Sequence, residues 1–173
     1  NGIMTSRTNK EFVGLDGLKH ALCIAIKKKL PKRGFGSGDL FFDGELFVEG
    51  GDFSKLSSVI KPAQHRKNYD PPEIQYHIYD CFDKCHMETP FVDRTRILKK
   101  ILTDINDRIR YVFTGVITTV DEIPIKLQEF LGAGDEGLML RQSNSAYVIR
   151  KRSNHLQKLK EFHDDEFLIV GFK

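Results

Sequence analysis

An alternation of short strand-like runs with amphipathic helical segments constrains the fold more than any other feature of these 173 residues. Helices are predicted where apolar residues recur every three or four positions, which occurs at 15–30, 94–106 and 120–134. Asp93 is the predicted N-cap of the second helix. Strands are predicted where apolar and aromatic residues form short runs, at 3–8, 40–50, 73–82, 109–119, 136–142, 146–152, 155–160 and 166–173. This mixture predicts an α+β fold of antiparallel-rich sheets and covering helices, in one domain that spans 1–173.

The composition indicates the broad class of protein. Hydrophobic residues make up 40% and charged residues 29% of the chain, which is typical of a folded, water-soluble domain. The net charge of +3 is too small to establish a nucleic-acid partner, although it is compatible with one locally basic face. No apolar run approaches the ~20 residues of a membrane-spanning helix, so no membrane association is expected.

The cysteines favour a reducing, intracellular compartment. Their number is odd, with Cys23, Cys81 and Cys85, which does not suit a disulfide framework. The run "CFDKCH" suggests a zinc site, but no second ligand pair follows at the spacing of a zinc finger. Buried or idle thiols are therefore the favoured interpretation.

Two carboxylates lie within the predicted strand 40–50. The side-chain period of two places Asp43 and Glu45 on one face beside Phe47, with Gly44 leaving open space on the other face. Because the flanking residues are apolar on both faces, we expect a strand that is buried on both sides, in which the acids need a metal or a cation. The alternative is an edge strand with a solvated acidic face.

Charged residues also mark two later predicted strands. Glu136 begins a strand directly after a glycine-rich turn, where a carboxylate could hold a divalent metal or simply face water. Lys158 and Lys160 are two positions apart, so a strand presents both ammonium groups on the same face, where they repel each other. Such a pair is either solvated at the surface or directed at a strongly negative group.

Five motifs, taken in order, resemble the nucleotidyltransferase (adenylation) domain of ATP-dependent DNA ligases, and compact viral ligases in particular. They are Ser6-Arg7-Thr8, "FDGELF" at 42–47, "YHIYDCF" at 76–82, "EGLMLR" at 136–141 and "LQKLKEFHDDEF" at 156–167. The resemblance implies an ATP-grasp-like nucleotidyltransferase fold. RNA-capping enzymes and RNA ligases share the scaffold and the order of the motifs, and they remain an alternative.

The resemblance also implies an activity. A lysine attacks the α-phosphate of ATP, the resulting lysyl-AMP passes AMP to the 5′-phosphate of a nick, and the 3′-hydroxyl then attacks to seal the strand. ATP and Mg²⁺ (or Mn²⁺) are the implied cofactors, and nicked duplex DNA is the implied partner of a monomer. Such an enzyme serves replication, repair or recombination in the cytoplasm, the nucleus or a viral replication site.

Residue roles follow from the same resemblance for the nucleotide. Lys158 and Lys160 match the paired lysines that contact the α-phosphate. Tyr79 matches the aromatic residue that stacks on adenine, with an ordinary core aromatic as the alternative. Glu45 matches the acid that reaches the ribose and supports the metal, and Glu136 matches the metal-binding acid. Asp43 belongs to the same motif as Glu45 and is included among the expected metal ligands.

The basic residues carry the implied contacts to DNA. Arg7 matches the arginine that touches the ribose or the nick phosphate. Arg150, Lys151 and Arg152 precede the lysine strand, and any of the three could lie near the 5′-phosphate of the nick.

Two departures from the family pattern qualify the resemblance. The family nucleophile lies in a Lys-x-Asp-Gly motif, and no such motif occurs in these 173 residues, so the nucleophile is expected before residue 1. The chain also stops at Gly171-Phe172-Lys173, where the family continues into an OB-fold. The expectation is a partial adenylation domain that lacks both ends and is inactive alone. A non-catalytic nucleic-acid-binding relative is the other alternative.

Overall fold

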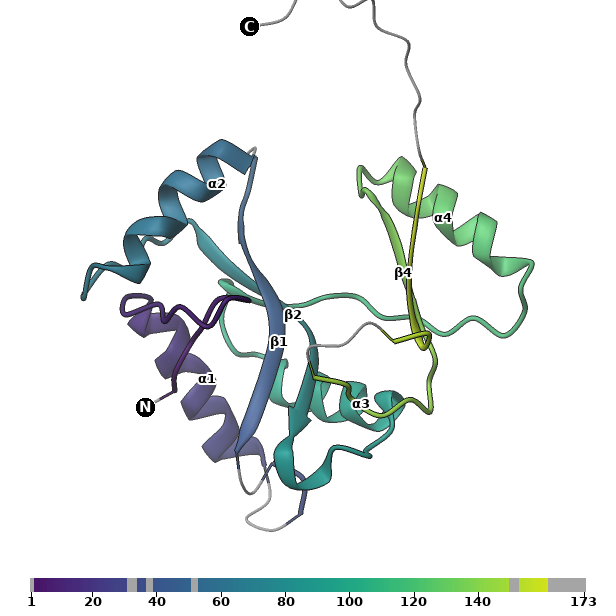
Figure 1. Ribbon diagram of the computed structural model, residues 1–173, viewed down its shortest axis with the longest axis horizontal. Coiled ribbons are helices and arrows are strands. Elements are labelled where there is room, and N and C mark those ends of the chain that lie inside the picture. The colour runs from purple at the N-terminus through teal and green to yellow at the C-terminus, as the bar shows by residue number, and fades with distance from the viewer. Residues whose placement is uncertain (1, 31–33, 37–38, 51–52, 150–152, 162–173) are drawn as a thin grey trace, which may run out of the picture. The chain divides into compact units, whose positions relative to one another are not determined.

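The computed structural model describes residues 2–30, 34–36, 39–50, 53–149 and 153–161 (Figure 1). The chain forms two compact units. The first comprises Asn1–Thr114 and Ser143–Ile149, and the second comprises Gly115–Gln142 and Arg150–Lys173. The chain therefore leaves the first unit, returns to it for one short segment, and leaves it again.

A three-stranded sheet forms the centre of the first unit, in the order β1 (Leu40–Val48), β2 (Ile74–Asp83) and β3 (Ile109–Tyr111). β1 and β2 run antiparallel, from the pair Leu40 and Asp83 to the pair Val48 and Ile74. β3 runs parallel to β2. The sheet is therefore mixed, and the α+β fold class predicted from the sequence is confirmed.

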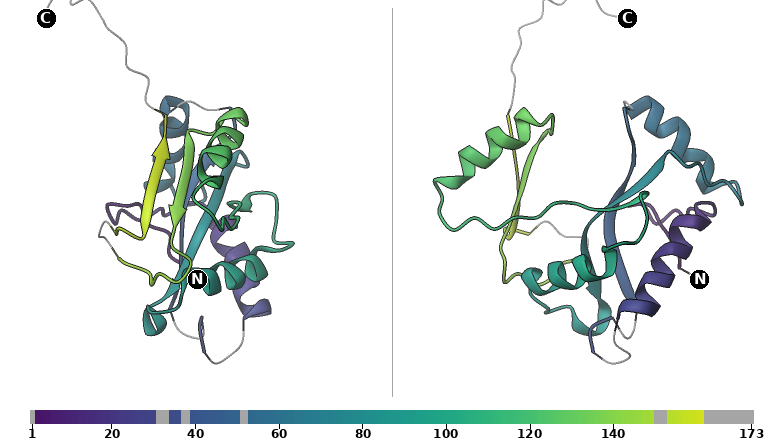
Figure 2. Two further views of the ribbon diagram at one scale, coloured as in Figure 1. Left: turned by 90° about the vertical axis from the view of Figure 1, so that its right-hand side faces the viewer. Right: turned by 180° about the vertical axis from the view of Figure 1, so that it is seen from behind.

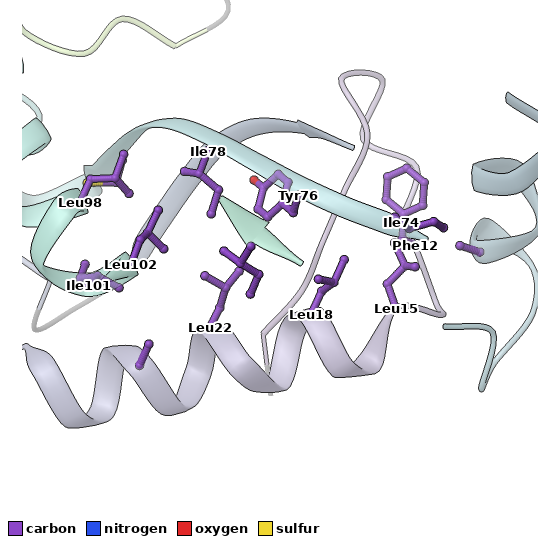
Figure 3. Packing of buried hydrophobic residues seen from close by; sticks show 14 of the residues in the cluster. Phe12, Leu15, Leu18, Leu22, Ile74, Tyr76, Ile78, Leu98, Ile101 and Leu102 are labelled. Carbon is purple, nitrogen blue, oxygen red and sulfur yellow. The ribbon is translucent and has the colours of Figure 1, made fainter. Parts of the chain in front are cut away.

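Helices α1 (Asp16–Lys29) and α3 (Phe91–Leu102) bury their apolar faces in the core of this unit. Figure 3 shows Leu18 and Leu22 of α1 directed toward the sheet, in a cluster that includes Ile78 of β2 and Leu98 of α3. All four side chains are at least nine-tenths buried. Each contributes ~1.5–3 kcal/mol to the free energy of unfolding, before the entropy cost of ordering is subtracted.

Long-range polar contacts fix both ends of this core. At the start of α1, Asp70 accepts a hydrogen bond from the backbone N–H of Gly17 (2.7 Å) and pairs with Arg108 (2.6 Å). At the end of β2, the carboxylate of Asp83 is fully buried and accepts hydrogen bonds from the N–H groups of Gly36 and Cys85. Both carboxylates thus connect segments that are distant in the sequence.

Among the described residues of the first unit, Arg94 forms the most deeply buried ion pair. Its Nε and Nη2 donate to the two carboxylate oxygens of Asp80, at 2.9 and 3.0 Å. Its Nη1 donates to the carbonyl oxygens of Thr89 and Ser145. One side chain of α3 therefore holds β2 and the returning segment 143–149 together.

The second unit contains α4 (Glu122–Gly132), β4 (Gly137–Arg141) and β5 (Leu156–Lys160). β4 and β5 pair antiparallel, and α4 packs on β4 (Figure 2). At the start of α4, one carboxylate oxygen of Glu122 accepts from the backbone N–H and the hydroxyl groups of Thr118 and Thr119, at 2.9–3.1 Å. These bonds satisfy donors that precede the helix and define where it begins.

The structure corrects several predicted elements. The strand predicted at 3–8 is a single bridge between Thr5 and Glu11 around a turn. The strand predicted at 109–119 ends at Tyr111, although the N–H of Val112 still donates to the carbonyl oxygen of Ile78 in β2. Residues 113–119 and 146–149 form no strand, because neither stretch pairs with a neighbouring strand among the described residues. The strand predicted at 166–173 and part of that at 146–152 lie outside the described residues.

The helix predictions at 15–30 and 120–134 are confirmed, but two details differ. α3 begins at Phe91 with Pro90 as its N-cap, so Asp93 lies inside the first turn and does not cap the helix. A helix that the sequence did not indicate, α2 (Phe53–Ile60), follows β1 and continues into a 3₁₀ turn at Lys61–Gln64. A second 3₁₀ turn, Lys84–His86, follows β2.

β1 is less buried than predicted. Its residues are mostly half-buried, and the side chains of Glu45 and Phe47 are exposed. Gly44 does not leave open space, since a Cβ atom there would lie 2.3 Å from the carbonyl oxygen of His77. The glycine is needed because the two backbones approach closely at this point.

None of the helices among the described residues has the length and apolar character required to cross a membrane.

Candidate functional site

The predicted site residues fall in two groups, one in each compact unit. Asp43, Glu45, Tyr79 and Arg7 belong to the first unit, and Glu136, Lys158 and Lys160 belong to the second. Arg150, Lys151 and Arg152 lie outside the described residues.

Glu45 lies on the exposed part of β1, opposite His77 of β2. The ring of His77 stacks on Phe47, with centroids 4.6 Å apart, and its Nε2 lies 2.8 Å from the Gln75 side-chain oxygen. Burial lowers the pKa of His77 and Arg110 lowers it further, while Glu45 acts in the opposite direction. The carboxylate of Glu45 therefore lies within electrostatic range of an imidazole that tends to remain neutral.

Tyr79 occupies an irregularity between β1 and β2. Asp43 pairs with Asp80 and Gly44 pairs with Ile78, so Tyr79 is the unmatched residue of a β-bulge. Bulges re-aim side chains, and here the hydroxyl of Tyr79 donates to Asp43 Oδ1 at 3.3 Å. The other oxygen of Asp43 accepts from the hydroxyl of Tyr147 at 2.6 Å. The two tyrosines thus share one carboxylate.

The paired lysines project from β5 toward the start of β4. Lys158 Nζ lies 2.9 Å from Glu136 Oε2, and Lys160 Nζ lies 3.5 Å from Glu136 Oε1. The predicted common face of the two lysines is confirmed, and one carboxylate lies between their ammonium groups. Hydrogen bonding from Lys158, and then the charges of both lysines, hold the pKa of Glu136 below its ordinary value.

Gly137 brings these charges together. Its φ of +149° is a conformation that L side chains rarely adopt, and a Cβ atom there would lie 2.2 Å from the carbonyl oxygen of Leu159. The start of β4 therefore lies against β5 so closely that only glycine fits, which places Glu136 within reach of both lysines.

The first unit also contains cysteines, for which the sequence raised the question of a zinc site. Within the described ranges, His, Cys, Asp and Glu form no group of three that could hold a metal ion. Cys81 is buried, and burial raises the pKa of its thiol to about 12, whereas Cys85 is exposed. The burial of Cys81 agrees with the favoured interpretation of buried or idle thiols. Cys85 is free and exposed, and that it is idle stays a prediction.

Arg7 is exposed in the turn between Thr5 and Glu11. A hollow of about 340 Å³ lies between α2 and the ends of β1 and β2, lined by Val48, Glu49, Lys55, Val59, Glu73 and Gln75. It contains none of the predicted site residues, so we do not connect it with the chemistry of the motifs.

Sequence reasoning did not find His77, Tyr147 or Arg94. His77 could have been noticed as the residue two positions before Tyr79 on the same strand. No local signal marks Tyr147, which meets Asp43 across 104 positions of the sequence.

Comparisons with known proteins agree with the motifs. The family described as "ATP dependent DNA ligase domain" matches residues 3–160. A DNA ligase of African swine fever virus is 29% identical over 175 residues, which cover 98% of this chain and 39% of the viral protein. A DNA ligase of Archaeoglobus fulgidus is 28% identical over 98 residues, covering 57% of this chain and 17% of that protein.

Solved structures show the same fold. The Chlorella virus DNA ligase-adenylate has a TM-score of 0.67 at 20% identity, and the match covers 92% of this chain and 55% of the viral chain. A structure described as "Pmar-Lig_PreS3" has a TM-score of 0.72 over 92% of this chain and 37% of its own. This chain spans about 39% of the length of the African swine fever virus ligase. Because the family match extends from residue 3 to residue 160, the chain belongs to the ATP-dependent DNA ligase domain family.

Proposed function

We propose that this chain is the adenylation-domain part of an ATP-dependent DNA ligase, which seals nicks between a 5′-phosphate and a 3′-hydroxyl through lysyl-AMP and DNA-adenylate intermediates. The family match over 3–160 supports this proposal. The single structural observation that carries it is the cluster of Lys158, Lys160 and Glu136 on paired strands.

Lys158 and Lys160 bind and neutralise the α-phosphate in this proposal. Each step of the reaction is a displacement at phosphorus, in which positioning and charge neutralisation dominate catalysis. Two ammonium groups on one strand face suit that task, because a phosphate can replace the carboxylate of Glu136 as their shared counter-charge. The side chain of Glu136 is 68% exposed, so it is free to exchange that contact.

The residues are suited to Mg²⁺, which prefers carboxylate and phosphate oxygens and keeps several waters. Glu45 in the first unit and Glu136 in the second are both exposed carboxylates, and each by itself is a candidate ligand for the ion beside the nucleotide. The ion neutralises phosphate charge when it is bound. Asp43 is less suited, since both of its oxygens already accept hydrogen bonds.

Tyr79 forms one wall of the adenine site in this proposal. Its place in a β-bulge supports the assignment, because a bulge turns a side chain out of the regular alternation. Tyr79→Ala is expected to weaken ATP binding much more than Tyr79→Phe, as measured by calorimetry. Equal losses in the two variants would assign the effect to the hydroxyl, and two unaffected variants would remove Tyr79 from the site.

Covalent labelling tests the overall proposal. The 173-residue chain, incubated with α-labelled ATP and Mg²⁺, is expected to acquire no label, since the expected lysine motif is absent from it. The intact protein is expected to acquire an acid-labile label, which Lys160→Ala reduces, and to seal a nicked duplex.

Other labelling results would point elsewhere. Label from GTP, or sealing of RNA alone, would favour a capping enzyme or an RNA ligase. Binding of nicked duplex by the intact protein without any label would favour the non-catalytic relative. Label mapped to Lys158 or Lys160 in the short chain would contradict the role of this pair.

DNA contact is proposed to be mainly with phosphates. Arg7 is exposed in its turn, and Arg150, Lys151 and Arg152 are the further candidates in the sequence. Binding of nicked duplex by the intact protein should therefore weaken steeply with salt and vary little with sequence. Strong preference among nick sequences at fixed salt would argue against this mode of contact.

A further inference from the structure

The carboxylate of Asp43 joins two tyrosines from distant parts of the sequence. Tyr79 lies on β2, and Tyr147 lies in the segment 143–149, which follows β4 in the chain but belongs to the first unit. The Tyr147 hydroxyl donates to Asp43 Oδ2 at 2.6 Å, the length of a strong bond to an ionised acceptor. The bond from Tyr79 to Oδ1 is longer, at 3.3 Å.

The ring of Tyr147 is fixed independently of its hydroxyl. It stacks on Phe82, with centroids 4.1 Å apart and an interplanar angle of 17°. The guanidinium of Arg94 lies over the same ring, 5.5 Å from its centroid. The Tyr147 backbone N–H donates to the carbonyl oxygen of Met87. The ring that carries the donor to Asp43 is therefore held by contacts with three other residues, which is what a positioning contact needs.

The phenol of Tyr147 remains a donor across the working pH range. Burial raises its pKa, and the hydrogen bond to Asp43 and the negative charge of that carboxylate raise the pKa further. Because the phenol keeps its proton, Tyr147 is the donor and Asp43 is the acceptor of this hydrogen bond.

We propose that Tyr147 and Asp43 are positioning residues: Tyr147 fixes the carboxylate of Asp43, and Asp43 fixes the ring of Tyr79 that faces adenine. The inference rests on the proposed function. This proposal gives Asp43 a role other than that of a metal ligand, because each oxygen of Asp43 accepts a hydrogen bond from one of the two tyrosines.

The experiment uses the intact protein and compares Tyr147→Phe with the wild type. The substitution keeps the ring on Phe82 and removes only the donated hydrogen. We expect the KM for ATP in adenylate formation to rise about tenfold with kcat nearly unchanged, which corresponds to ~1.4 kcal/mol. Asp43→Asn should raise KM by a similar factor, and its Mg²⁺ titration midpoint should match that of the wild type.

The double variant Tyr147→Phe/Asp43→Asn separates positioning from general loss of structure. Because both changes break the same connection to Tyr79, the double variant should cost no more than either single variant. Tyr111→Phe is the matched control: it removes another hydroxyl from this sheet, on a ring that faces Lys99 at 5.4 Å. Its KM should remain that of the wild type.

Distinct results would overturn this inference and the proposed function. Unchanged KM in Tyr147→Phe and Asp43→Asn, in a wild type that binds ATP, would overturn only the positioning role. Additive losses in the double variant, or a shifted Mg²⁺ midpoint in Asp43→Asn, would also overturn it, the latter in favour of metal binding. A wild type that binds no adenine nucleotide would overturn both.

Discussion

Arg94 and Asp80 form a two-bond ion pair in which the side chains are 1% and 0% exposed. The guanidinium also holds carbonyl oxygens of Thr89 and Ser145, and these contacts lie inside the first unit. An isolated charge at this depth is very costly, and the pair is tolerated because almost every donor and acceptor is satisfied.

Loss of Arg94 should therefore destabilise the protein severely. Arg94→Ala leaves Asp80 buried without its partner, and we expect the free energy of unfolding to fall by about 3–5 kcal/mol in urea denaturation. Arg94→Lys should recover little, because an ammonium cannot reproduce the two parallel bonds. The control is Arg96→Ala, which removes a surface pair with Asp93 and should cost about 0–1 kcal/mol. A loss at Arg94 as small as at Arg96 would contradict this view of the pair.

Gly44→Ala should disturb the junction of β1 and β2. The added Cβ atom would lie 2.3 Å from the backbone oxygen of His77, so the strands must separate. Overpacking of this kind costs about 1–3 kcal/mol, measurable as a lower melting temperature. Gly132→Ala, at the end of α4 with no atom within 4 Å, is the matched control and should leave stability unchanged or slightly raised. Equal melting temperatures for the two variants would show that the strands have room to adjust.

Glu136→Ala should reduce nick sealing by the intact protein by at least ~10-fold, while the melting temperature stays near that of the wild type. The carboxylate is exposed at a strand end, so its loss removes a ligand and the counter-charge of two lysines without opening the core. Glu129→Ala, which removes an exposed acid of α4 paired with Lys126, is the control and should seal normally. Near-normal sealing by Glu136→Ala at every Mg²⁺ concentration would reduce Glu136 to a surface acid.

Acid should destabilise the first unit in a pH window set by two of its carboxylates, the buried Asp83 and the partly exposed Asp70. Burial alone would raise the pKa of Asp83, but bonds from Cys85, Gly36 and His86 outweigh it and hold the pKa below the ordinary 3.8. The pKa of Asp70 is also lowered: burial raises it, but the hydrogen bonds from Arg108 and Gly17 outweigh the effect of burial.

A carboxyl group whose pKa is lower in the folded state than in the unfolded state stabilises the fold at pH values above its unfolded-state pKa. This stabilisation is lost as the pH falls through the folded-state pKa. The free energy of unfolding should therefore decline below about pH 4. Asp83→Asn should flatten this decline, measured by urea denaturation at a series of pH values. Asp93→Asn, at an exposed pair, should leave it steep. The same slope in Asp83→Asn and the wild type would exclude Asp83 as a cause.

Local pattern was sufficient for the elements whose apolar spacing is strong. Helices at 16–29 and 122–132, and strands at 40–48 and 74–83, lie close to their predicted positions, because periodicity reflects the face that must be buried. α2 was missed because its segment, "FSKLSSVI", combines serines with an apolar face too short for a clear period. The stretch 113–119 has strand-like composition but no partner strand among the described residues, and strand formation depends on such a partner.

The candidate site likewise has some features that the sequence predicted and others that only the tertiary structure fixes. The order of the motifs, and the common face of Lys158 and Lys160, follow from residues that are neighbours in the chain, where a period of two is enough to predict a shared face. The carboxylate between those lysines belongs to Glu136, which is 24 positions from Lys160, and the contact of Tyr147 with Asp43 spans 104 positions. Such contacts depend on strand register, on a bulge at Tyr79 and on the path of segment 143–149. These features arise only when distant segments pack together, because local pattern records which face a residue occupies and not which residue it meets there.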